Sequence, residues 1–163
     1  MGLEMNVARN SAYNILIILM LLASTTLSEV LADGAGTSSK WDKQPEHLRQ
    51  SLELLEAEKY LAAVDELTQL LSNREKDADV LNLLGFSHRN LSNFDIALEF
   101  YEQALAVDPQ HKGALEYLGE LYLQTNHPDK AEAQLEKLSD LCTFCKERKK
   151  LRKALKRYHS KQS

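Results

Sequence analysis

The fold is decided by residues 78–111, which read ADVLNLLGFSHRNLSNFDIALEFYEQALAVDPQH. In the second half of this stretch, apolar residues recur at i, i+4, i+7 and i+8, as they do on one face of an α-helix. The first half carries Gly85 inside another apolar segment, where a glycine lowers helix propensity. That cost is explained if two antiparallel helices approach closely at this residue. The stretch therefore predicts a helical hairpin, and one face of its second helix is made by Ala97, Tyr101, Ala104 and Leu105.

The same stretch resembles a tetratricopeptide repeat, a helix-turn-helix motif of about 34 residues. His88 stands where the motif usually has a tyrosine. The resemblance implies one unit of a superhelix that binds other proteins along its groove and has no catalytic role. The positions that match the motif are Leu81, Leu84, Gly85, Ala97, Tyr101, Ala104 and Pro109.

A single repeat cannot bury its apolar face alone, so neighbouring repeats are expected on both sides. Shifting the frame by one repeat length gives a good match at residues 112–145 and a weaker one at 44–77, where Ser51 replaces the glycine. We expect an all-α fold, a tetratricopeptide superhelix of about three helix-turn-helix repeats (44–77, 78–111 and 112–145). A C-terminal basic capping helix and tail, residues 146–163, would follow.

Residues 1–32 have the pattern of a secretory signal peptide. Arg9 precedes an apolar run over residues 15–23, and the segment ends on Ala32. This run is too short to span a bilayer, for which about 20 apolar residues are needed. We therefore expect cleavage after Ala32 and an exported protein, periplasmic or secreted. An uncleaved membrane anchor is the alternative.

The segment that follows the predicted cleavage site, residues 33–43, has the Gly and Ser content of a flexible leader. Trp41 is its exception. We expect this side chain to pack on the first helix pair, with a contact to a partner protein as the alternative.

Charge is distributed unevenly along the chain. The whole chain has a formal net charge of -4, but residues 146–163 hold nine Lys or Arg and one Glu. Residues 33–145 hold ten basic and twenty-one acidic residues. A basic helix at the end of a solenoid is interpreted first as a solvated cap. The alternatives are contacts with an acidic partner or with an anionic membrane surface. Nucleic acid is not expected for an exported protein without an aromatic stacking set.

Cys142 and Cys145 form a CxxC pair. In an oxidising compartment such a pair favours a disulfide, which here would set the angle at which the chain enters the cap. A thioredoxin-like redox site would need a strand before the helix, and a zinc site would need a second ligand pair. A c-type haem site would need a histidine where Lys146 stands. We expect a disulfide, no metal site and no cofactor.

The resemblance implies that the first helix of each repeat lines the partner-binding groove. Projected onto this sequence, the groove residues are Asn82, Phe86, Arg89, Glu116 and Glu120. The amide of Asn82 and the guanidinium of Arg89 are suited to a peptide backbone or carboxylate, with Phe86 as an apolar anchor. The lysines and asparagines of the family's chaperone-type carboxylate clamp are absent.

No catalytic residue set is identified by spacing, so the predicted function is a non-catalytic scaffold or adaptor rather than an enzyme. It would bind a partner peptide or helix and aid assembly of an envelope complex. Self-association through the same groove is a further possibility. The alternative function is a thiol-redox or haem-associated accessory protein that uses Cys142 and Cys145.

Intact mass spectrometry of the protein purified from its native source tests both the export and the cysteine predictions. We expect the mass of a chain that begins at Asp33, less the two thiol hydrogens that are lost when Cys142 and Cys145 form a disulfide. A mass that includes residues 1–32 would contradict cleavage, and an added haem mass would favour the alternative function.

Overall fold

The computed structural model describes residues 45–73 and 76–162. The predicted signal peptide, the leader and Trp41 lie outside these residues. The described part is entirely helical, without a strand, which confirms the predicted all-α class. No helix in these ranges is both long and apolar enough to cross a membrane. The elements are η1 (Glu46–Leu48), α2 (Arg49–Glu56), α3 (Tyr60–Asn73), α4 (Ala78–Asn90), α5 (Phe94–Val107), α6 (Lys112–Gln124), α7 (Pro128–Leu141) and α8 (Lys146–Gln162).

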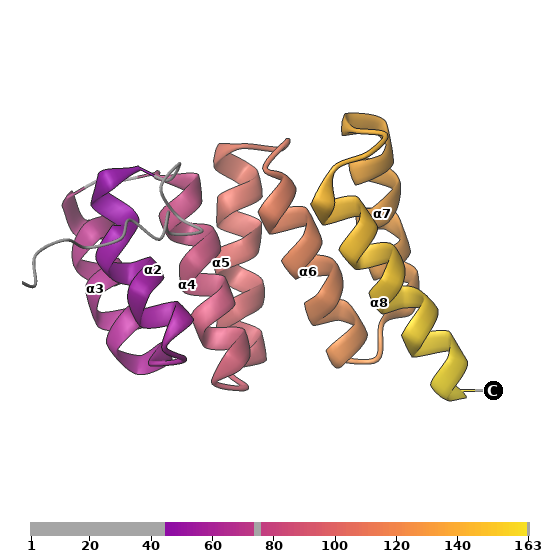
Figure 1. Ribbon diagram of the computed structural model, residues 1–163, viewed down its shortest axis with the longest axis horizontal. Helices are drawn as coiled ribbons and strands as arrows, with labels where there is room; N and C mark the ends of the chain where they lie inside the picture. The colour runs from indigo at the N-terminus through magenta and orange to yellow at the C-terminus, as the bar shows by residue number, and fades with distance from the viewer. Residues whose placement is uncertain (1–44, 74–75, 163) are drawn as a thin grey trace, which may run out of the picture. The chain divides into compact units, whose positions relative to one another are not determined.

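The helices form antiparallel pairs that stack side by side, α2 with α3, α4 with α5 and α6 with α7 (Figure 1). Their starts repeat at one repeat length: α4, α6 and α8 begin at Ala78, Lys112 and Lys146. Helix α8 therefore occupies the place of the first helix of a further repeat, and it packs on both α6 and α7. We call α2, α4, α6 and α8 the A-helices, and α3, α5 and α7 the B-helices.

The turn inside each helix pair has the same backbone conformation. Glu58, Ser92 and Asn126 all have positive φ, between 55° and 64°. The next residue in each turn donates its N–H to a carbonyl five residues back, for example Asn93 to His88 at 2.9 Å. This is the bonding of a Schellman motif, which ends the A-helix and reverses the chain.

Neighbouring A-helices are also joined at the start of α6 by His111. Its Nδ1 accepts the backbone N–H of Ala114 at 3.0 Å, so the proton resides on Nε2. That nitrogen lies 3.0 Å from Oδ1 of Asp79 at the start of α4, and donates to it. The hydrogen bond from His111 holds the pKa of the Asp79 carboxyl below its usual value. The contact caps α6 and fixes the spacing of α4 and α6.

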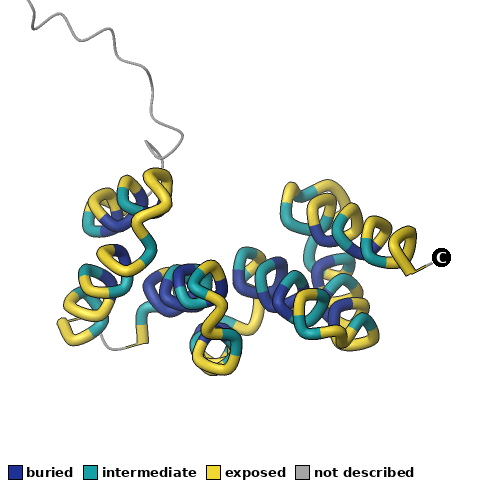
Figure 2. The backbone as a smooth tube through the Cα atoms, turned by 90° about the horizontal axis from the view of Figure 1, so that it is seen from below, coloured by how far each residue is buried: buried dark blue, intermediate teal, exposed yellow. Residues whose placement is uncertain are grey.

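The buried residues lie where neighbouring helices face one another (Figure 2). Two glycines mark the closest approaches. A Cβ at Gly85 would lie 2.6 Å from Cε1 of Tyr101, a ring that is fully buried on α5. A Cβ at Gly119 would lie 2.5 Å from Cδ2 of Leu151 on α8. The second contact closes the apolar end of the last helix pair, where α8 supplies Leu151 and Leu155 to the core.

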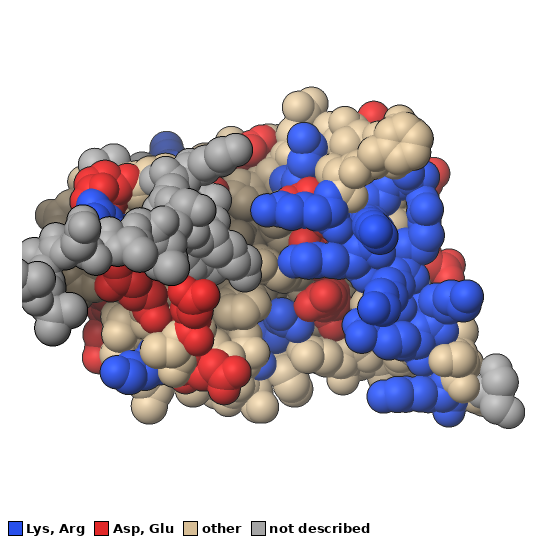
Figure 3. All heavy atoms as spheres, viewed as in Figure 1, with Lys and Arg blue, Asp and Glu red and all other residues tan. Residues whose placement is uncertain are grey.

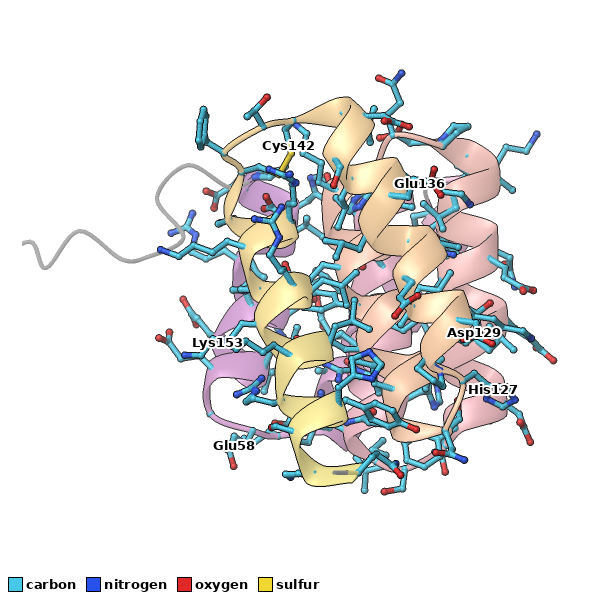
Figure 4. The ribbon with its side chains drawn as sticks, turned by 90° about the vertical axis from the view of Figure 1, so that its right-hand side faces the viewer. Glu58, His127, Asp129, Glu136, Cys142 and Lys153 are labelled. Atoms are coloured by element: carbon cyan, nitrogen blue, oxygen red, sulfur yellow. A yellow bond between two sulfur atoms is a disulfide. The ribbon has the colours of Figure 1, made fainter. Side chains whose placement is uncertain are left out.

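The chain enters α8 through a short turn that holds both cysteines. Figure 4 shows Cys142 at the end of α7, with its sulfur at disulfide distance from that of Cys145. Their Cα atoms are 5.7 Å apart, within the usual range for a disulfide. The Arg148 side chain donates to the carbonyl of Thr143 and, at 2.9 Å, to the hydroxyl of Ser139. These bonds fasten the first turn of α8 to α7.

Replacement of Gly85 by Ala tests the close approach of α4 and α5. The new methyl group would lie 2.6 Å from the fully buried Tyr101 ring, so we expect a cost in the upper part of the range of about 1–3 kcal/mol that overpacking has. Since Ala gains only about 1 kcal/mol in helix propensity, we expect a lower free energy of unfolding in urea titrations. Gly113→Ala is the control, because its new methyl group would meet only the ends of two side chains at 3.2 and 3.3 Å. A Gly85→Ala chain as stable as the wild type would contradict the packing.

Candidate partner-binding cleft

Arg89 is the centre of a polar and aromatic cluster on the A-helices. Its guanidinium carbon lies 5.5 Å from the ring centroid of Phe86 and 5.6 Å from that of Tyr117. Its Nη1 lies 3.1 Å from Oε2 of Glu120, so that an ion pair joins α4 to α6. Only 9% of the Arg89 side chain is exposed. Cation–π contacts contribute about 0.5–2 kcal/mol each, and together with the ion pair they hold this buried charge in one position.

A cleft of about 390 Å³ opens beside this cluster, between α6 and α8. Helix α4 contributes Arg89 to its wall, and α6 contributes Glu120, Leu123 and Gln124. We call it the cap cleft, since the remaining lining residues come from α8 and are Ala154, Arg157, Tyr158 and Lys161.

The structure brings together part of the predicted groove. Arg89 and Glu120 line the cap cleft, and Phe86 packs directly behind Arg89. Asn82 lies about two turns before Arg89 on α4 and is 94% buried, with no hydrogen-bond partner for its Oδ1 within the described ranges. Glu116 is fully buried and does not reach the cleft.

Glu116 is instead paired with the cap helix. Its Oε1 lies 3.1 Å from Nζ of Lys150, which also lies 6.0 Å from the centroid of the Tyr117 ring. Burial raises the pKa of the Glu116 carboxyl to about 7, although Lys150 acts in the opposite direction. This pair and the Arg89–Glu120 pair link three successive A-helices through their side chains.

The sequence analysis missed the contribution of α8 to the site. Adding one more repeat length to Glu116 and Glu120 gives Lys150 and Ala154, and adding it to Leu123 gives Arg157. The periodicity therefore places these α8 residues in line with the groove, whereas the charge pattern alone favoured a solvated cap and gave a partner contact only as an alternative. Tyr117, which holds one face of Arg89, was not identified as a groove residue either.

Basic side chains gather over α8, as Figure 3 shows. Arg157 and Lys161 lie at the edge of this basic surface that borders the cap cleft. No cluster of three or more His, Cys, Asp or Glu residues suited to a metal ion occurs within the part of the chain that the structure describes. The cap cleft itself combines charged side chains with the aromatic ring of Tyr158 and apolar groups.

Residues 91–141 match the family model described as Tetratricopeptide repeat. These residues therefore carry tetratricopeptide-repeat sequence, and the fold of the described chain is a tetratricopeptide-type superhelix. The translocator chaperone SycD of Yersinia enterocolitica type III secretion shares the fold, with a TM-score of 0.63 and 20% identity over 77% of this chain and 97% of SycD. SycD in complex with a peptide of the translocator YopD gives a TM-score of 0.62 at 18% identity, over 75% of this chain and 96% of SycD. At these identities the likeness establishes the fold alone.

Among curated proteins, the 131 kDa subunit of transcription factor tau from Saccharomyces cerevisiae is similar to part of this chain. The two are 35% identical over 77 residues, which cover 47% of this chain and 8% of that subunit. The chain spans less than half the length of the curated relatives that it matches.

The raised pKa of Glu116 makes the free energy of unfolding depend on pH. Its usual value is 4.5 and its native value is about 7, so between these values the native chain holds a proton that the unfolded chain releases. The free energy of unfolding should therefore fall as the pH rises from about 5 to about 7, by about 1–2 kcal/mol. Urea titrations across this interval should show a flatter pH dependence for Glu116→Gln. An unchanged dependence would contradict the raised pKa.

Proposed function

We propose that this protein is a non-catalytic adaptor that holds an extended peptide or a helix of a partner protein in the cap cleft. The observation that carries the proposal is the cleft itself, a hollow between packed helices beside the buried Arg89. Its lining combines apolar groups, such as Leu123 and Ala154, with a few charged ones. Ligand sites in proteins commonly have this combination.

The rigidity of the lining supports binding by a preformed surface. Arg89 is held by two rings and one carboxylate, and the Tyr158 hydroxyl donates to Oδ1 of Asn126 in the turn after α6. Side chains that are already ordered lose little conformational entropy on binding, so a few contacts suffice for affinity. The SycD complex with a YopD peptide supports the proposal by analogy of fold.

The proposal includes an extracytoplasmic location, where the adaptor would aid assembly of an envelope complex. The signal-peptide pattern of residues 1–32 supports export. The cysteine pair at disulfide distance is in agreement with an oxidising compartment. We assign this pair a structural role at the entry to α8, because Arg148 ties the same turn to α7.

A displayed library of random peptides, selected on the purified chain, tests the proposed function. Gln124→Trp places an indole in the cap cleft. We expect it to raise the Kd of the selected peptides by about tenfold or more, equivalent to about 1.4 kcal/mol of binding free energy. Gln69→Trp is the matched control, since Gln69 is exposed on the B-helix α3. Peptides that bind both variants equally well, or a selection that enriches nothing, would refute binding in the cleft.

A further inference from the structure

We propose that the cap cleft recognises a carboxylate of the bound peptide, and that Arg157 and Lys161 of α8, together with Arg89, form the positively charged site that binds it. The inference rests on the proposed function, because it names the chemistry of the ligand held in that cleft. It assigns α8 a direct part in recognition in addition to its part in closing the core.

The charges around the cleft are not balanced within it. Three cations and one carboxylate, that of Glu120, line the hollow. Glu120 is already paired with Arg89. Within residues 45–73 and 76–162, the side chains of Arg157 and Lys161 have no ion-pair partner. The cleft therefore has an excess of positive charge that an anionic group would neutralise.

Arg89 retains donor capacity although it is nine-tenths buried. A guanidinium carries five N–H donors, and Glu120 engages Nη1. Nε is buried and has no hydrogen-bond partner among the described residues. The buried Tyr101 hydroxyl interacts with the guanidinium inside the core, so a ligand in the cleft would use the Nη donors that Glu120 does not engage. The two rings beside the guanidinium keep it oriented for a planar carboxylate.

The apolar part of the lining favours an acidic residue of a peptide over an extended anionic surface. Leu123, Ala154 and the ring of Tyr158 offer a wall for the methylene groups of an acidic side chain, or for the residue that bears a free C-terminal carboxylate. A low-dielectric wall also strengthens the attraction between the carboxylate and the cations. A flat bilayer cannot enter a hollow between two helices, whereas a peptide can.

Three short peptides of one Leu-, Gly- and Ser-based sequence serve as probes. The first is acetylated and amidated and carries two central Glu residues, the second has Gln at those positions, and the third is the Gln peptide with a free C-terminal carboxylate. Each is titrated into the isotope-labelled chain, and amide NMR shifts are followed. We expect the Glu peptide, the free-acid peptide or both to shift the amides of Gln124 and Tyr158, and the amidated Gln peptide to leave them unchanged.

Arg157→Glu and Lys156→Glu are matched variants, adjacent on α8 and equal in charge change. Both residues are exposed, but only Arg157 lines the cleft. Near physiological salt, charges more than about 8 Å apart are largely screened. Arg157→Glu should therefore raise the Kd of the peptide that binds by about tenfold, and Lys156→Glu should raise it by less than about threefold. Circular dichroism checks that both variants are folded.

The remaining outcomes separate this inference from the proposed function. Equal binding of the amidated Glu and Gln peptides in the cleft would overturn carboxylate recognition and leave the adaptor proposal standing. No shift with any of the three peptides would also overturn the inference. Equal losses in the two variants, with binding to phosphatidylglycerol vesicles lost in parallel, would show that α8 acts as a general anionic-surface contact and would overturn it as well.

Discussion

The contact between Leu151 and Gly119 is the one on which the arrangement of the site depends. A stack of helix pairs always leaves one apolar face open at its end, and exposure of that face to water is unfavourable. Because Gly119 has no side chain, Leu151 packs directly on the α6 backbone and brings α8 close along its length. The same approach places Lys150 beside Glu116 and Arg157 at the edge of the cap cleft. The packing of α8 on α6 therefore closes the core and forms the site at the same time.

The ion pairs between the A-helices have a second consequence. Burial of a charge is costly unless partners compensate it, and apolar replacements are often as stable. Arg89 and Glu116 are nonetheless nearly inaccessible to water, each paired with a residue of the next A-helix. We infer that these pairs help to specify the register between successive helix pairs, because each one forms only when the two A-helices are aligned. In Arg89 the same charge also faces a hollow, so the residue that aligns the repeats is also available to a ligand.

The fold also places the acidic and basic parts of the chain at different positions in the structure. The helix pairs carry most of the acidic residues, and the basic residues of α8 are added at one end (Figure 3). Local pairs such as Lys150 with Glu116 neutralise part of this basic charge, and the cap cleft keeps an unpaired remainder. In the proposed carboxylate recognition, that remainder determines which peptides bind.

The sequence by itself determined the helical hairpins, since the spacing of Ala97, Tyr101 and Ala104 and the position of Gly85 are local properties of one helix pair. It also located Arg89 and Glu120 among the candidate groove residues. Only the tertiary structure decided that these two are partners, that Glu116 turns to Lys150, and that Arg157 and Lys161 reach the same cleft. The physical reason is that these residues are about one or two repeats apart in the chain. Periodicity gives the position of each residue along its A-helix, but the distances between them depend on how closely successive A-helices pack, as where Leu151 fills the space that Gly119 leaves open.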